Sequence, residues 1–152
     1  MIKQLYLHVL RLCNRLGWLG PLAVRVVIGA AFARNGWGKL HNLDAITEFF
    51  TQLGIPMPHA NAVFVSSVEC IGGVLLVLGL GTRIAALFLI GVMTVATLTA
   101  VWPDADKTLL DSIEISYLLS FLWLVVAGPG RVSIDHLLAR KAGGEQVGEA
   151  LG

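Results

Sequence analysis

Four stretches of the chain are apolar over about the length that a helix needs to cross a bilayer. They are residues Leu19–Trp37, Asn61–Leu80, Thr82–Trp102 and Leu109–Gly128. An α-helix rises about 1.5 Å per residue, so roughly 20 apolar residues cover a hydrocarbon layer of ~30 Å. The pattern therefore predicts an all-α fold, a bundle of four transmembrane helices within residues 19–138. Only a very short turn separates the second and third segments, so we expect them to form a tight helical hairpin.

Two other segments place apolar residues at helical spacing with charged residues between them. Residues 1–18 repeat leucine or valine every three or four positions, interrupted by Arg11 and Arg15. This pattern predicts a short amphipathic helix in the membrane interface. The linker after the first apolar segment has a similar pattern, which begins near Asn42 and stops at Gly54. We expect a second amphipathic helix there, in the first outer loop and across one mouth of the bundle.

The overall composition favours a membrane protein. Of the 152 residues, 56% are hydrophobic and 14% are charged, whereas soluble domains carry about a quarter charged residues. One core could not bury so much apolar surface in water, but lipid can solvate it. A net charge of +1 gives no electrostatic reason to expect a nucleic-acid partner. Residues 139–152 are polar and glycine-rich, which predicts a flexible C-terminal tail.

The basic residues predict an orientation. With four crossings, both termini and the loop between the second and third segments share one side of the membrane. That side carries Lys3, Arg11, Arg15, Arg83, Arg131, Arg140 and Lys141, and the other side carries Asp44, Glu48, Asp104, Asp106 and Asp111 beside only two lysines. Because basic loops favour the cytoplasm, we expect a multi-pass protein of the bacterial inner membrane with both termini in the cytoplasm.

Four ionisable residues interrupt the apolar segments: Arg25, Arg34, Glu69 and Glu114. A charge in the bilayer centre costs a few kcal/mol, so we expect the arginines and glutamates to pair inside the bundle. From the helical rise, Arg34 and Glu114 lie about 22 Å and 21 Å above the inner end of their segments, and Glu69 about 17 Å. Arg34 and Glu114 match best in depth, and either arginine could reach Glu69.

These charges allow two interpretations. Ion pairs can set the register of helices without any further role. Alternatively, the charges form a polar intramembrane site that binds a lipid head group, a quinone-like ligand or a proton. The sequence does not decide between the two.

The chain shows no self-contained catalytic motif, neither a nucleophile elbow nor a phosphate-binding loop nor a zinc motif. Cys13 and Cys70 form no CxxC pair, and His41 and His59 only bracket the outer loop. We therefore expect no metal and no intrinsic cofactor, and at most a subunit of an oxidoreductase that receives electrons from a partner.

Several short motifs, in this order and spacing, resemble the DoxX family of integral membrane proteins. The residues that carry the resemblance are Arg25–Gly29, Asn35–Leu40, Glu69–Gly73, Leu78–Leu80, Gly128–Arg131 and Ser133–Asp135. Together they cover the chain from about Gly20 to Leu138. The sequence departs from the family pattern at Asn35, where members often have histidine, and this argues against imidazole chemistry at that position.

The resemblance implies a four-helix inner-membrane protein. Some members are similar to the small quinone-reducing subunit of thiosulfate:quinone oxidoreductase, and others are proposed to tether soluble redox or sulfur-handling enzymes to the membrane. We therefore expect a membrane subunit or anchor of a redox, thiol-stress or quinone-linked complex. A quinone or lipid would occupy a polar pocket, with candidate ligand-binding residues Arg25, Arg34, Glu69 and Glu114, and Gly36 and Lys39 at its outer rim.

Two alternatives stay open. The protein could be a non-catalytic membrane scaffold whose charges only hold the helices together, or a small transporter with no redox role. Four short crossings leave little room for transport unless the protein forms a homo-oligomer. Membrane lipid is an expected partner in every case, and a soluble redox or sulfur-handling enzyme in the first.

Overall fold

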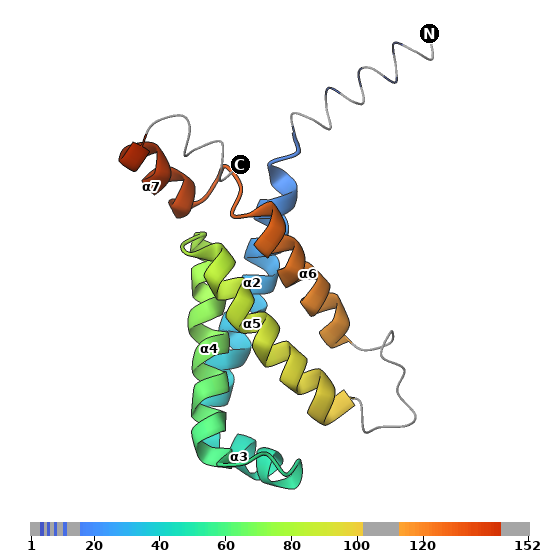
Figure 1. Ribbon diagram of the computed structural model, residues 1–152, viewed down its shortest axis with the longest axis vertical. Helices are drawn as coiled ribbons and strands as arrows, with labels where there is room; N and C mark the ends of the chain where they lie inside the picture. Colours follow the sequence, from blue (N-terminus) through green and yellow to red (C-terminus); the bar gives the residue numbers. More distant parts are fainter. Residues whose placement is uncertain are drawn as a thin grey trace.

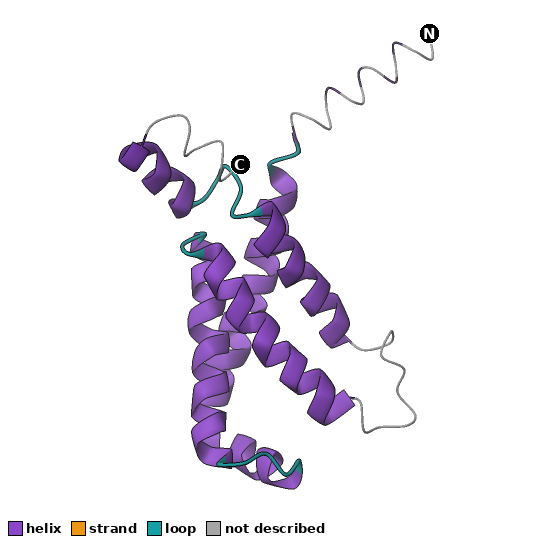
Figure 2. Cartoon of the chain, viewed as in Figure 1, coloured by secondary structure: helices purple, strands orange, loops and turns teal. Residues whose placement is uncertain are grey.

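Every regular element in the described part of the chain is a helix. The computed structural model describes residues 4, 6, 8, 11, 16–101 and 113–143, and within them no strand occurs (Figure 2). The helices are α2 (Leu19–Leu40), α3 (Leu43–Gln52), α4 (Pro58–Leu78), α5 (Thr82–Ala96), α6 (Ile113–Ala127) and α7 (Ile134–Gly143). A single π-helical turn, η1 (Thr97–Val101), extends α5. The predicted all-α class is confirmed.

The arrangement follows the apolar pattern of the sequence. Figure 1 shows α2, α4, α5 and α6 as the long elements of the molecule, with α3 lying across one end and α7 near the other. The amphipathic helix expected after Asn42 is present as α3. The interfacial helix expected over residues 1–18 lies mostly outside the described residues. Helix α7 continues to Gly143, past residue 139, the predicted start of the tail, and the remaining residues of that tail lie outside the described part of the chain.

Helices α4 and α5 form the predicted tight hairpin. Gly79 and Gly81 flank Leu80 and adopt φ angles of 67° and 56°. These left-handed conformations are common for glycine and costly for residues with a Cβ atom. The chain can therefore reverse within three residues, which places α5 directly against α4.

Small residues bring the backbones of α2 and α4 close together. The two helices run antiparallel and side by side in Figure 1. A Cβ atom added to Gly73 would lie 2.6 Å from the carbonyl oxygen of Gly29, and one added to Gly36 would lie 2.7 Å from that of Ser66. Close approach of this kind is how helices pack in membranes, where apolar side chains gain little by leaving lipid.

The centre of the bundle is a small aromatic and aliphatic core. The ring of Phe32 on α2 makes edge-to-face contacts with Tyr117 and Phe121 on α6, each at a centroid distance of 5.0 Å. Leu76, Leu89 and Leu124 pack around them and are fully buried. Aromatic pairs in this geometry contribute about 0.5–1.5 kcal/mol each beyond the area that they bury. Phe32 thus joins the first and last of the long helices.

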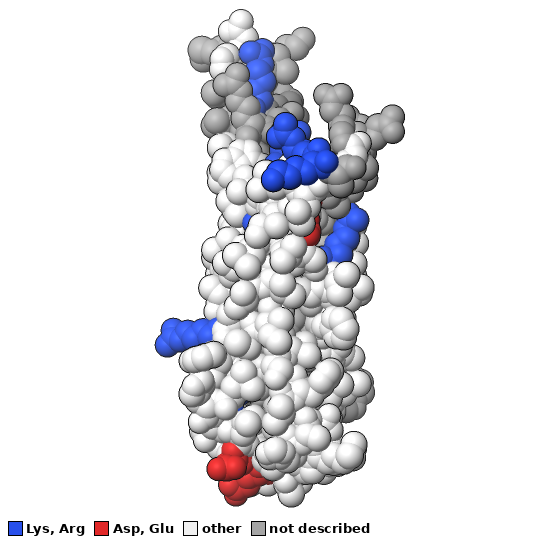
Figure 3. Space-filling model, turned by 90° about the vertical axis from the view of Figure 1, so that its left-hand side faces the viewer, with Lys and Arg blue, Asp and Glu red and all other residues white. Residues whose placement is uncertain are grey.

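The outer surface of the helices is unusually apolar. Val27, Phe88 and Val126 are 68%, 57% and 73% exposed, and Trp123 projects from α6 rather than packing in the core. The face in Figure 3 is largely uncharged between its two ends. By length and composition, two helices in the described part could cross a membrane, Pro58–Leu78 and Thr82–Thr99. Water would solvate such a surface poorly, and lipid would solvate it well.

The close contact at Gly36 can be tested with a matched pair of substitutions. We expect Gly36→Ala to lower stability by about 1–3 kcal/mol, because the new methyl group would meet the backbone of α4. Gly38→Ala, two residues along the same helix, adds its methyl group to open space and should leave stability unchanged or slightly higher. The thermal unfolding midpoints of both variants in one detergent check this. Equal losses would contradict the described packing of α2 on α4.

Candidate functional site

A large cavity lies between the long helices toward the end of the molecule that α3 covers. Its volume is about 1160 Å³, and residues of α2, α3, α4, α5 and α6 line it. In Figure 1, α5 and α6 diverge from α2 and α4 toward this end. Most of the lining is aromatic or aliphatic, from side chains such as Phe49, Phe50, Phe64, Val68, Leu87 and Phe88. The cavity therefore suits a ligand with a substantial apolar portion.

Lys39 and Glu69 form an ion pair in the wall of this cavity. The Lys39 Nζ atom donates a hydrogen bond of 2.7 Å to Glu69 Oε1. The Glu69 side chain is 3% exposed and that of Lys39 is 35% exposed, so the carboxylate is buried while the ammonium reaches the cavity. The geometry follows from the helix contact, because Gly36 packs on Ser66 and Cys70 and places the next turn of α2 beside Glu69.

One oxygen of the Glu69 carboxylate has no hydrogen-bond partner within the described residues. This atom, Oε2, is buried, and so is the Ser66 hydroxyl one turn before it on α4, which also lacks a partner there. A buried acceptor without a partner costs about 1–3 kcal/mol. Both atoms are buried, so this unused hydrogen-bonding capacity lies behind the cavity wall and not on its surface.

Further polar side chains border the same cavity from several helices. Glu114 and Tyr117 come from α6, Asn35 from α2 and Asn61 from α4. Glu114 is only partly buried. The cavity thus combines an apolar body with a few acidic, basic and amide groups, which is the composition of a site for an amphipathic molecule.

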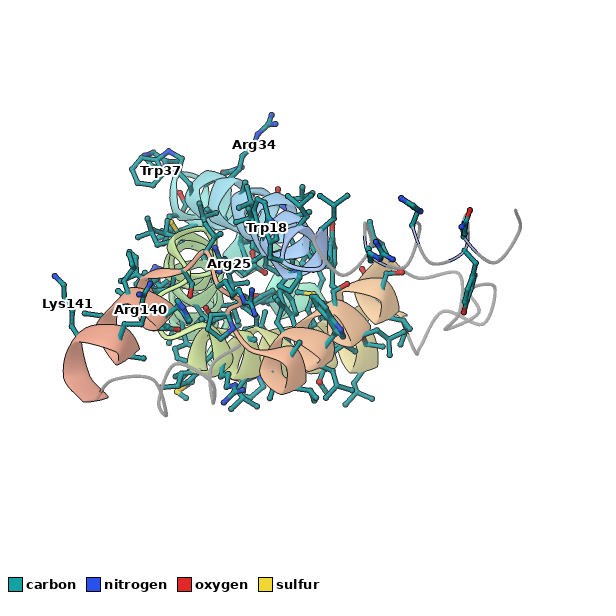
Figure 4. All side chains as sticks on the ribbon, turned by 90° about the horizontal axis from the view of Figure 1, so that it is seen from above. Trp18, Arg25, Arg34, Trp37, Arg140 and Lys141 are labelled. Carbon is teal, nitrogen blue, oxygen red and sulfur yellow. The ribbon has the colours of Figure 1, made fainter. Side chains whose placement is uncertain are left out.

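The structure overturns the expected pairing of Arg34 with Glu114 or Glu69. Arg34 is exposed, and Figure 4 shows its side chain pointing away from the helices, on the same side as Trp37. The helical rise gives the depth of Arg34 along the bundle, but it does not give the face of α2 on which Arg34 lies. Arg34 lies two residues before Gly36, about 200° around the helix from the face that contacts α4.

Arg25 is buried but belongs to the other end of the bundle. Nine residues separate it from Arg34, about two and a half helical turns, so the two arginines occupy opposite faces (Figure 4). The Arg25 guanidinium donates hydrogen bonds to the carbonyl oxygens of Pro129 and Val132. Neither arginine lines the cavity, and neither does Gly36. Of the predicted site residues, the structure brings Lys39, Glu69 and Glu114 to the cavity.

A second network at that end was not predicted. The Asp135 carboxylate accepts hydrogen bonds from the backbone N–H groups of Gly81 and Thr82, at 2.7 and 3.0 Å. It thereby satisfies free donors at the start of α5, and it does so from α7, 53 residues away in sequence. With Arg25 it ties the segment after α6 to α2 and to the α4–α5 hairpin.

The histidines do not form a metal site in the described part of the chain. The His41 ring packs against Trp37 at a centroid distance of 4.4 Å, with the two planes tilted by 45°, and both His41 and His59 are exposed. No group of three or more histidine, cysteine, aspartate or glutamate side chains comes together among the residues that the structure describes.

Apolar helices of membrane length, joined by a tight hairpin around an amphiphile-sized cavity, define a small helical membrane protein. The chain belongs to the DoxX family, whose model matches residues 20–102. The matched region contains Lys39 and Glu69, whereas Glu114 and Tyr117 lie beyond it.

Three curated relatives match over most of their length. "Inner membrane protein YqjF" of Escherichia coli is 28% identical over 125 residues, which is 81% of this chain and 95% of the relative. "Putative oxidoreductase CatD" of Bacillus subtilis is 31% identical over 123 residues, 77% of this chain and 85% of the relative. "Uncharacterized membrane protein Rv3486" of Mycobacterium tuberculosis is 29% identical over 145 residues, 87% and 89% of the two chains. No solved structure matches the chain.

The contrast between the two arginines yields a second prediction. Arg25→Met should lower stability by at least about 2 kcal/mol, because it leaves two carbonyl oxygens without their donor. Arg34→Met removes an exposed charge and should leave stability unchanged or higher. Thermal unfolding of both variants in the same detergent gives the comparison. A loss in Arg34→Met as large as that in Arg25→Met would contradict the assignment.

Proposed function

We propose that this protein crosses the bacterial inner membrane four times and holds a quinone-like amphiphile in the cavity around Lys39 and Glu69. It would act as the membrane subunit of a redox assembly, with the ligand as the electron carrier. Relatives named as inner membrane proteins and one named "Putative oxidoreductase CatD" are consistent with this assignment. The observation that carries it is the ion pair in the wall of a large apolar cavity.

The four-pass arrangement adds α2 and α6 to the two helices whose length and composition would allow them to cross a membrane, Pro58–Leu78 and Thr82–Thr99. Helix α2 has 22 residues, enough to cross. Its Arg25 is buried and Lys39 lies in its last turn, whereas Arg34 faces outward six residues before the end of the helix and would extend its long side chain toward the membrane interface. Helix α6 has 15 described residues, which are mostly apolar, with Glu114 in the first turn. Basic groups at the α7 end, namely Arg83, Arg131, Arg140 and Lys141, oppose the acidic Asp44 and Glu48 on α3. The positive-inside rule then puts the α7 end in the cytoplasm.

The cavity has room for both parts of such a ligand. A volume of about 1160 Å³ exceeds the roughly 300–1,000 Å³ typical of pockets for drug-sized molecules. The apolar lining would hold a hydrocarbon tail, and the Lys39 ammonium can donate to an oxygen of the head group while bonded to Glu69. Because α5 and α6 diverge from α2 and α4 near α3 (Figure 1), the ligand would enter from the outer half of the membrane.

The redox chemistry itself would be shared with a partner. A bound quinone supplies the electron-accepting group, and the chain contributes binding, orientation and exclusion of water. Electrons would come from a soluble redox or sulfur-handling enzyme docked on the membrane. Binding of the amphiphile is the step that this chain can perform by itself, and it is therefore the step to test.

A cavity-filling substitution tests ligand binding without touching the ion pair. Gly91 borders the cavity, and a Cβ atom there would meet nothing within 4 Å. We expect Gly91→Phe to weaken binding of decylubiquinone at least tenfold, because the ring would occupy part of the space for the ligand. Affinity is measured by calorimetric titration of the protein in lipid nanodiscs.

The matched control is Gly38→Phe, which also adds a ring at a glycine with open space around it but lies outside the cavity lining. It should bind as the wild type does. If the wild-type protein does not bind decylubiquinone, or if Gly91→Phe binds it undiminished, the proposed function is wrong.

A further inference from the structure

Arg34 places a positive charge on the outer face of α2, within the segment proposed to cross the membrane. Its side chain is exposed and projects from α2 on the same side as Trp37 (Figure 4). Within four residues on either side, α2 carries only apolar residues, glycine and Asn35. In the described residues the ion pair is that of Lys39 with Glu69, so Arg34 has no carboxylate partner in that part of the chain.

The depth of Arg34 determines which anions can neutralise it. It lies six residues before Leu40, the last residue of α2, which is about 9 Å along the helix axis. Side chains of a helix lean toward its N-terminus, so Arg34 has to bend back along α2 to reach the outer head groups. A charge at this depth is costly unless it meets a counter-ion. The phosphate groups of phospholipids are the anions that every bilayer supplies at the level of the head groups.

The next turn of α2 continues the same face with side chains suited to the membrane interface. Trp37 is 61% exposed, and its ring packs against that of His41, whose Nδ1 atom is hydrogen-bonded to the Trp37 carbonyl oxygen. Indole rings favour the level of the head groups, where their N–H group can donate to a lipid oxygen. Residues three apart are neighbours on a helix surface, so Arg34 and Trp37 can contact the same lipid molecule.

The face of α2 toward the bilayer centre from Arg34 is uncharged. Ala23, Val27 and Ala30 precede Arg34 at a spacing of three or four residues, and all three are exposed. They lie on the side of α2 opposite to Gly36, which contacts α4. An acyl chain can therefore extend along this apolar surface from a phosphate held at Arg34.

We infer that Arg34 and Trp37 form a binding site for an anionic phospholipid of the outer leaflet, on the face of α2 that points away from the cavity. The inference rests on the membrane crossing and orientation of α2 in the proposed function, and not on the quinone. The planar guanidinium can donate two parallel N–H bonds to the phosphate oxygens. Phosphatidylglycerol has no cationic group that competes for its phosphate, whereas phosphatidylcholine has one, so the site prefers phosphatidylglycerol.

Native mass spectrometry of the delipidated full-length protein gives the direct test. Phosphatidylglycerol and phosphatidylcholine with identical acyl chains are titrated separately, and the dissociation constant of the first bound lipid is determined for each. We expect phosphatidylglycerol to bind about fivefold more tightly, which is the ratio that one arginine beside an anionic lipid provides. Arg34→Gln should abolish this preference. Arg34→Lys should retain part of it, because it keeps the charge but loses the paired N–H donors.

The matched control is Arg140→Gln. Arg140 is also exposed, and it projects from α7 (Figure 4), so its substitution changes the net charge by the same amount at a different place. This variant should keep the fivefold preference. Equal binding of the two lipids by the wild-type protein, or equal losses in Arg34→Gln and Arg140→Gln, would overturn the inference.

The same spectra distinguish a lipid from a second copy of the chain. If Arg34→Gln changes the number of chains in the assembly and leaves lipid binding as it was, Arg34 pairs with a carboxylate of a neighbouring copy and the inference is wrong.

Titration with decylubiquinone separates this inference from the quinone site. Neither Arg34 nor Trp37 lines the cavity, so the Arg34→Gln protein should bind decylubiquinone as the wild type does. A wild-type protein that prefers phosphatidylglycerol but does not bind decylubiquinone would contradict the proposed quinone site and leave the lipid site standing. The reverse result would overturn the lipid site alone.

Discussion

The bond between Lys39 and Glu69 is the interaction on which the rest of the structure depends. Glu69 sits near the middle of an apolar helix, where an isolated carboxylate would be costly. Its partner can reach it only because the backbone of α2 approaches that of α4 at Gly36, where even a methyl group would collide with Ser66. Gly36 and Lys39 lie one turn apart on α2. Together they determine how α2 packs on α4 and where the ion pair lies in the cavity wall.

Hydrogen bonds connect the helices at the α7 end of the molecule, whereas the helices diverge toward α3. At the α7 end, Arg25 and Asp135 bond to backbone groups of two separate segments, the stretch after α6 and the α4–α5 hairpin, and these bonds hold the helices together without using the side chains of the core. Toward α3 the helices diverge, as Figure 1 shows, and the cavity occupies the space between them. The hydrogen bonds at the α7 end thus hold the helices in place, and the space for a ligand lies at the α3 end.

The sequence was sufficient to predict most of the fold because the membrane imposes a simple rule of length and polarity. The long apolar helices, the hairpin at Gly79 and Gly81, and helix α3 all follow from local pattern. The ion pair between Lys39 and Glu69 was not predictable in the same way. Helical rise gives the depth of Arg34, but its direction depends on which face packs against α4, and that is set by Gly36. The bond from Asp135 to the start of α5 joins residues far apart in sequence, and no local signal marks it.

An experimental structure of the protein in lipid nanodiscs tests the central claim most directly. The account predicts density for one elongated amphiphile in the cavity, with a head-group oxygen within hydrogen-bond distance of Lys39 Nζ. A cavity closed by α5 packing against α4, or one in which Glu69 is turned out of the cavity wall and away from Lys39, would contradict it.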